Sequence, residues 1–127
     1  MTPEQAVLAA NETFYRSFEK KDLEAMTAVW SQGTSSVCIH PGRKAICGWD
    51  GIRSSWETIF RNTSYLEIET EIVRIEVNGD LAYVVLVETV LQVTGKRQNK
   101  AQSVATNIFE RLGQKWYLVH HHGSPLI

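Results

Sequence analysis

The chain has 127 residues, with 13 lysine and arginine side chains against 14 aspartate and glutamate side chains. Its net charge of −1 excludes a protein that binds nucleic acid or a membrane surface through its charge. No apolar stretch approaches the roughly 20 residues that a membrane-spanning helix needs, and the N-terminal residues lack a signal-peptide pattern. We therefore expect a single domain over residues 1–127, located in the cytoplasm, where Cys38 and Cys47 are buried free thiols.

The first half of the chain has the hydrophobic period of helices. Residues 2–5 form a capping-box pattern at the start of a first helix, which is expected to end near residue 20. Residues 23–30 are predicted to form a short second helix. Asp50 is predicted to cap a third helix that ends near residue 62. Three helices are therefore expected before the period changes.

The rest of the chain is predicted to form strands. Residues 37–39 and 43–47 are expected to pair as two short strands. From residue 65 onwards, four long apolar segments are separated by turn residues, of which 78–80 (Asn-Gly-Asp) is a strong hairpin signal. The alternation changes phase near residues 73–74, which indicates a β-bulge. Helices first and an antiparallel meander afterwards predict an α+β fold.

Two of the predicted strands are apolar on both faces. Residues 83–87 carry apolar side chains at every position, and so do residues 116–119. One face of the sheet covers the helices, and in a chain of this length a second copy is the expected cover for the other face. The sequence therefore predicts a homodimer that forms through the sheet.

The order of these elements resembles the nuclear transport factor two fold, and the motifs resemble its SnoaL-like members, which are related to polyketide cyclases and ketosteroid isomerases. The resemblance rests on KDLEAM at 21–26, VCIHPG at 37–42, GWDGI at 48–52, TNIF at 106–109 and WYLVHHHGSP at 116–125. It implies a cystatin-like cone in which three N-terminal helices pack in the hollow of a curved, mostly antiparallel sheet. The same fold serves isomerases, cyclases, dehydratases, carriers and dimerisation modules.

His40 is the candidate catalytic residue. The resemblance places it where the related isomerases have a proton-shuttling aspartate, and an imidazole can accept and return a proton at neutral pH. The alternative is a histidine that only satisfies backbone carbonyls of its turn. The isomerases' tyrosine and second aspartate correspond to Phe14 and Thr106, so isomerisation of steroids in that form is not implied. Tyr15 or Asn107 is expected to orient the substrate oxygen instead.

Further side chains are predicted to line an internal pocket for a small apolar molecule. Aromatic rings can wall such a pocket, although tryptophans on helices that face a sheet also form ordinary core. Residues 120–122 lie on a strand, so His121 faces one side and the other two histidines face the opposite side. Which side faces the interior stays open. The predicted substrate-binding set is Phe14, Tyr15, Trp30, Trp56, Thr106, Asn107, His120, His121 and His122.

Two functions are compatible with these residues. The first is a small-molecule binder or an enzyme of the isomerase, cyclase or dehydratase type, which uses acid–base chemistry on a small apolar carbonyl compound. Glu88 interrupts an apolar strand. In such an enzyme it would serve as a general acid; the alternative is a charge pair at a subunit interface or at the rim of the sheet. No carboxylate near the histidines completes a metal site, so neither a metal nor a cofactor is predicted. The second function is a non-catalytic homodimerisation or scaffold module.

Overall fold

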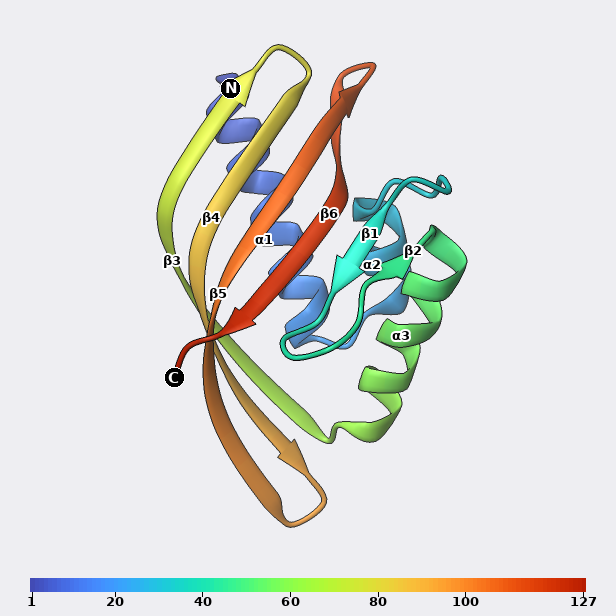
Figure 1. Cartoon of the computed structure of the whole chain (residues 1–127), viewed down its shortest axis with the longest axis vertical. Coiled ribbons are helices and arrows are strands. Elements are labelled where there is room, and N and C mark those ends of the chain that lie inside the picture. The colour runs from blue at the N-terminus through green and yellow to red at the C-terminus, as the bar shows by residue number, and fades with distance from the viewer.

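A computed structural model describes residues 1–127 of the chain. Three helices, α1 (Pro3–Glu19), α2 (Leu23–Val29) and α3 (Trp49–Asn62), pack against a curved six-stranded sheet (Figure 1). The strands are β1 (Val37–Ile39), β2 (Ile46–Cys47), β3 (Tyr65–Asn78), β4 (Leu81–Thr94), β5 (Arg97–Leu112) and β6 (Lys115–Pro125). This is the predicted α+β fold. None of the helices is long and apolar enough to cross a membrane.

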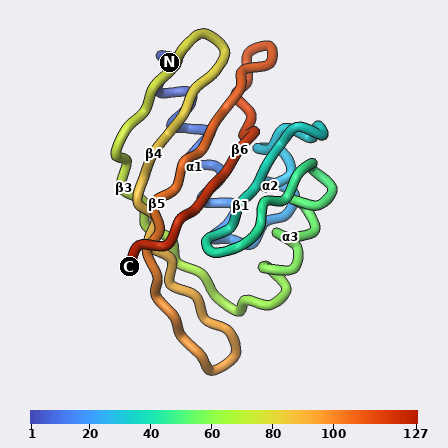
Figure 2. The backbone as a smooth tube through the Cα atoms, in the orientation of Figure 1, coloured from blue at the N-terminus to red at the C-terminus, as the bar shows by residue number.

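The sheet has the strand order β2-β1-β6-β5-β4-β3. Every neighbouring pair is antiparallel except β1 and β6, which run parallel with Cys38 opposite His121. The backbone trace shows that the β4–β5 hairpin continues well past the end of β6 (Figure 2). The parallel pair matters most for the site, because it carries the chain from Cys38 to His40 alongside the C-terminal strand.

Two of the three helix caps are the predicted ones. In α1 the Thr2 hydroxyl accepts from the backbone N–H of Gln5, and the Gln5 side chain accepts in return from the backbone N–H of Thr2. Asp22 caps α2. The prediction that Asp50 caps α3 is wrong, because the N-cap is Gly48, two residues earlier, and Asp50 lies in the first turn of the helix. Gly48 has a φ of 88°, a left-handed conformation that glycine adopts without strain.

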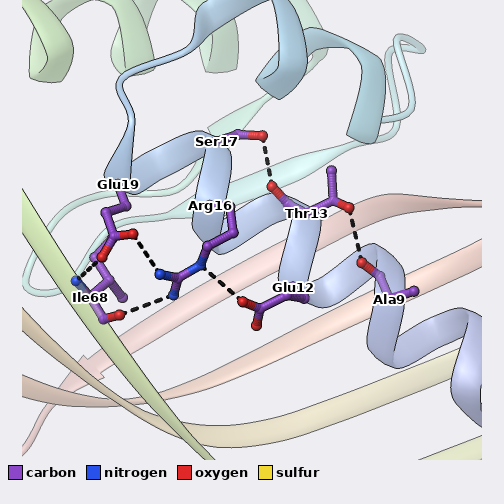
Figure 3. A network of polar contacts seen from close by, with 7 residues as sticks. All are labelled: Ala9, Glu12, Thr13, Arg16, Ser17, Glu19 and Ile68. Carbon is purple, nitrogen blue, oxygen red and sulfur yellow. Dashed lines mark hydrogen bonds and ion pairs between the residues drawn. The ribbon is translucent and has the colours of Figure 1, made fainter.

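A polar cluster joins α1 to the edge strand β3 (Figure 3). Arg16 forms ion pairs with Glu12 and Glu19 and donates a hydrogen bond of 3.0 Å to the carbonyl of Ile68. The Glu19 carboxylate accepts from the backbone N–H of Ile68 at 2.7 Å. The cluster therefore fixes the position of the helix against the sheet, next to the buried side chains described below.

The strand predictions hold with two differences. The bulge between residues 72 and 74 is confirmed. The second short strand is only Ile46–Cys47, shorter than the predicted 43–47, because the residues before it form a turn and loop. A further bulge, which the sequence does not signal, lies in the β5–β6 pairing at residues 108–109. It changes the phase of β6, so that Leu118 and His121 both face the interior.

Candidate functional site

His40 follows β1 and is held by one residue of α3. Its Nε2 lies 3.0 Å from the hydroxyl oxygen of Ser55, and this hydroxyl lies 2.7 Å from the carbonyl of Ile52. Because the carbonyl can only accept, the Ser55 hydroxyl donates its proton there and must itself accept from His40 Nε2–H. His40 Nδ1 is therefore left with its lone pair. Cys38 Sγ lies 4.0 Å from Nδ1 and 3.7 Å from Nε2.

The surroundings keep this imidazole neutral at pH 7. Burial, together with the positive charge of Arg43, lowers the pKa of His40 to about 4. The ring of Trp56 stands edge-on to it, with 4.8 Å between the ring centroids. Burial and the charge of Glu88 raise the pKa of the Cys38 thiol to about 12. The thiol thus keeps its proton and is no nucleophile, whereas His40 is present as a base.

His40 lies in the wall of a pocket between α3 and the loop that joins β1 to β2. The pocket has a volume of about 600 Å³ and opens to the surface. No aspartate or glutamate is among its lining residues, which are His40, Gly42, Arg43, Lys44, Ile46, Ser55, Thr58 and Ile59. The arrangement therefore combines a neutral imidazole with two cations and two apolar side chains.

A second group of polar side chains lies deeper between α1 and the sheet. The Tyr15 hydroxyl donates to Glu88 Oε2 at 2.8 Å. Asn107 Nδ2 donates to Asn11 Oδ1 at 2.9 Å and to the Tyr15 hydroxyl oxygen at 3.2 Å. His121 Nδ1 lies 2.5 Å from Asn107 Oδ1, which accepts from it. We call these five residues the His121 network; each of its members hydrogen-bonds another member.

Burial sets the protonation of the His121 network. It lowers the pKa of His121 to about 3, and the nearby histidines add to this effect. It raises the pKa of Tyr15 well above its usual range, with the charge of Glu88 as a second cause. The pKa of Glu88 is raised by burial and lowered in part by the hydrogen bond from Tyr15. At neutral pH both the tyrosine and the histidine are uncharged.

The structure brings six of the predicted site residues to the inner side of the sheet. His40 faces the pocket, and Tyr15, Asn107 and His121 belong to the His121 network. Phe14 packs between the two histidine-bearing regions, with ring centroids 5.6 Å from Trp56 and 5.0 Å from His121. The six residues are Phe14, Tyr15, His40, Trp56, Asn107 and His121. The question of which histidines face the interior is answered by His121, which is 1% exposed.

The other four predicted residues lie elsewhere. Thr106 lines a depression on the outer face of the sheet, and His120 and His122 flank His121 with their side chains on that face as well. Trp30 is fully buried core, 6.2 Å from the ring of Phe14. The alternation of side chains along β5 and β6 places Thr106, His120 and His122 on the face opposite to the helices.

Sequence reasoning missed four residues around the two groups. Asn11 lies four residues before Tyr15, on the same face of α1. The sequence signal for it is a polar residue within the apolar face of a helix. Ser55, Arg43 and Lys44 carry no signal until α3 and the β1–β2 loop are placed together. Both cysteines are free, but Cys47 is exposed where two buried thiols were expected, because β2 is an edge strand.

The curved sheet and its helices define the class of nuclear transport factor two-like proteins. A proposed dehydratase of this class from Streptomyces avermitilis matches with a TM-score of 0.91 and 30% identity, over 98% of this chain and 96% of that one. A proposed calcium/calmodulin-dependent protein kinase type II association domain from Thiobacillus denitrificans matches with 0.85 and 28%, over 99% and 96%. A ketosteroid isomerase-like protein from Erwinia carotovora atroseptica matches with 0.86 and 17%, over 98% and 96%, which shows the fold alone.

Within this class, the family model of the SnoaL-like domain matches residues 7–127. The chain belongs to the SnoaL-like domain family, as the motifs predict. A curated relative, F-box protein SKIP8 of Arabidopsis thaliana, is 26% identical over 123 residues, which are 97% of this chain and 51% of the relative. The chain thus spans about half the length of that relative.

Proposed function

We propose that this SnoaL-like chain binds a small, largely apolar carbonyl compound in the His40 pocket and moves a proton on it by acid–base chemistry, without a cofactor. One observation carries the proposal: His40 lines an open pocket, and Ser55 accepts from its Nε2–H, which leaves Nδ1 unprotonated. An imidazole bound to a helix hydroxyl, instead of to carbonyls of its own turn, is oriented for use.

The proposed reaction transfers one proton from the carbon beside the substrate carbonyl to His40 Nδ1, which later returns it. Ser55 holds the ring during both steps, and Ile46 and Ile59 pack against the apolar part of the substrate. The role expected for Tyr15 or Asn107 would require one bond of the His121 network to be exchanged for a bond to the substrate. The buried indole N–H of Trp56 has no partner and offers a free donor beside His40.

Exchange of hydrogen for deuterium tests this without knowledge of the natural substrate. We expect the wild-type protein to catalyse exchange of the protons beside the carbonyl of benzylacetone in D₂O, as followed by NMR. His40→Ala should slow the catalysed exchange by roughly 10²–10⁴-fold, the usual contribution of a positioned acid or base. Ser54→Ala, which changes an exposed side chain of α3 outside the pocket lining, is the control and should exchange like wild type. Absence of exchange in the wild type, or equal rates in His40→Ala, would contradict the proposal.

We also propose that two copies of the chain pair through the outer face of the sheet. This face carries apolar side chains that the helices do not cover, and Tyr83 there is 41% exposed. The half-buried members are Val85, Val87, Val104, Ile108 and Val119. Light scattering should give the mass of a dimer for wild type and of a monomer for Ile108→Glu. Arg61→Glu on the exposed side of α3 is the control; a monomeric wild type would refute the homodimer.

The second candidate function is a non-catalytic homodimerisation or scaffold module. It is favoured by the hydrogen bonding of the His121 network, in which both N–H donors of Asn107 and the hydroxyl of Tyr15 already have partners inside the protein. The 28% identity to a proposed association domain favours it as well. A stable dimer in which no carbonyl compound exchanges protons would select this function over the first.

For the compartment we propose the cytoplasm. The support is the state of Cys38 and Cys47, which are both free although they lie on paired strands. Free thiols are the usual state in a reducing compartment. Localisation of a tagged full-length protein by fluorescence microscopy would test this, and a secreted or organellar signal would contradict it.

A further inference from the structure

Two exposed cations line the His40 pocket without a carboxylate among the other lining residues. Arg43 and Lys44 line it, no carboxylate lines it, and neither cation takes part in an ion pair. The hydroxyls of Ser55 and Thr58 already donate to carbonyls of their own helix, at 2.7 and 3.0 Å. Among the side chains that line the pocket, Arg43 and Lys44 therefore hold the donors that have no partner.

We propose that the substrate of this pocket is an anionic carbonyl compound whose carboxylate is held by Arg43 and Lys44. A guanidinium offers two parallel N–H donors that match the two oxygens of a carboxylate, and an ammonium adds a second charge. Ile46 and Ile59 leave room for a hydrocarbon part, so an α-keto acid with an apolar chain fits the lining. This inference rests on the proposed function and narrows its substrate class.

Because Arg43 lies near His40, binding of a carboxylate to Arg43 also changes the pKa of His40. The charge of Arg43 is one cause of the lowered pKa of His40, with burial as the larger cause. A carboxylate bound to Arg43 offsets this charge and makes His40 easier to protonate. A neutral ketone in the same pocket leaves His40 as it is. A substrate with a carboxylate therefore strengthens the base that acts on it.

A matched pair of ligands tests the inference. Benzylpyruvate and benzylacetone share the ketone and the aromatic chain, and only the first carries a carboxylate beside the ketone. In calorimetric titrations of the wild-type protein we expect benzylpyruvate to bind at least about tenfold more tightly, the effect of two partly exposed charge pairs. The double variant Arg43→Ala/Lys44→Ala should lose this preference and keep its affinity for benzylacetone.

The control is Lys96→Ala/Arg97→Ala at the exposed turn of the β4–β5 hairpin, which removes the same charge from residues that do not line the pocket. It should keep the tenfold preference. Equal affinity of wild type for both ligands, or an undiminished preference in the Arg43/Lys44 variant, would overturn the carboxylate proposal while proton exchange of benzylacetone still tests the proposed function. Binding of benzylpyruvate without exchange in the presence of His40 would instead overturn the acid–base function and leave the anion site standing. Failure of both ligands to bind would overturn both.

Discussion

Two histidines lie where the parallel strands β1 and β6 run side by side, His121 on β6 and His40 directly after β1, yet they differ in what surrounds them. His121 is fully buried and donates a hydrogen bond from Nδ1–H to Asn107 within the His121 network. His40 is half-buried and lines an open pocket. It donates a hydrogen bond from Nε2–H to Ser55, and its Nδ1 stays unprotonated. A buried histidine is therefore no sign of function by itself; the sign is an unused donor or acceptor beside open space.

The largest expected effect comes from removing the centre of the His121 network. Asn107→Leu leaves His121 and Asn11 without the hydrogen bonds that Asn107 makes to them, and Tyr15 keeps only its bond to Glu88. Each unsatisfied buried group costs about 1–3 kcal/mol. We expect the free energy of unfolding to fall by about 3–6 kcal/mol in urea titrations. Asn99→Leu on an exposed position of the same strand is the control. A loss below about 1 kcal/mol for Asn107→Leu would show that the network does not stabilise the fold.

Acid should destabilise the protein through the same region. The pKa of His121 is lowered to about 3 in the folded protein, so between about pH 6.5 and 3 the unfolded chain binds more protons than the folded one. The stability that the neutral histidine allows is thus complete above pH 6.5 and is lost as the pH falls, by up to about 1.4 kcal/mol per pH unit.

Comparison of wild type with His121→Asn isolates this effect. The asparagine keeps an N–H donor for Asn107 and cannot be protonated, so its stability should fall less steeply between about pH 6.5 and 5. Glu88 acts in the opposite direction, since its raised pKa favours stability at low pH, but it is common to both proteins. Identical slopes in the two urea series would refute the assignment of His121 as a neutral buried base.

A smaller loss is expected from Tyr15→Phe. The change removes the hydroxyl that donates to Glu88 and accepts from Asn107, so it should cost about 1–2 kcal/mol without opening a large cavity. The pKa of Glu88 should rise further, because the hydrogen bond from Tyr15 lowers it. Thermal unfolding and carboxyl NMR titration measure the two effects. Tyr83→Phe is the matched control on the outer face, and an equal loss there would remove the special role of Tyr15.

The smallest change in stability is expected on the pocket side. Ser55→Ala removes the acceptor for His40 Nε2–H, at a surface pocket where water replaces it, so unfolding should change by less than about 1 kcal/mol. Exchange of benzylacetone should nevertheless slow about tenfold, because the ring loses its anchor. Ser54→Ala, which changes an exposed serine of the same helix outside the pocket lining, is the control. Exchange at the wild-type rate in Ser55→Ala would contradict a positioning role.

The contrast between the two histidines also marks the limit of prediction from sequence. The capping box at Thr2, the bulge after Ile72 and the hairpin at Gly79 are local signals, and the structure contains all three. The phase of β6 depends on the bulge at residues 108–109, which is a property of two paired strands and leaves no local pattern. The sequence alone therefore does not predict that His121 faces the interior or that it hydrogen-bonds Asn107.

The pocket was predictable only in part, for a related reason. The family motif indicates His40, and the helical spacing places Trp56 toward the interior. The anchor Ser55 and the cations Arg43 and Lys44 become relevant only when α3 and the β1–β2 loop meet, which no local pattern specifies. Serine, arginine and lysine are common on protein surfaces, so their presence in the sequence does not mark a site.

Histidine NMR of ¹⁵N-labelled protein tests the contrast most directly. Both rings should be neutral at pH 7 and in opposite tautomers, His40 protonated at Nε2 and His121 at Nδ1. Saturation with benzylpyruvate should shift the ring signals of His40 and leave those of His121 in place. Identical tautomers, or a ligand that shifts His121 and not His40, would contradict the division of the interior into an open site and a closed network.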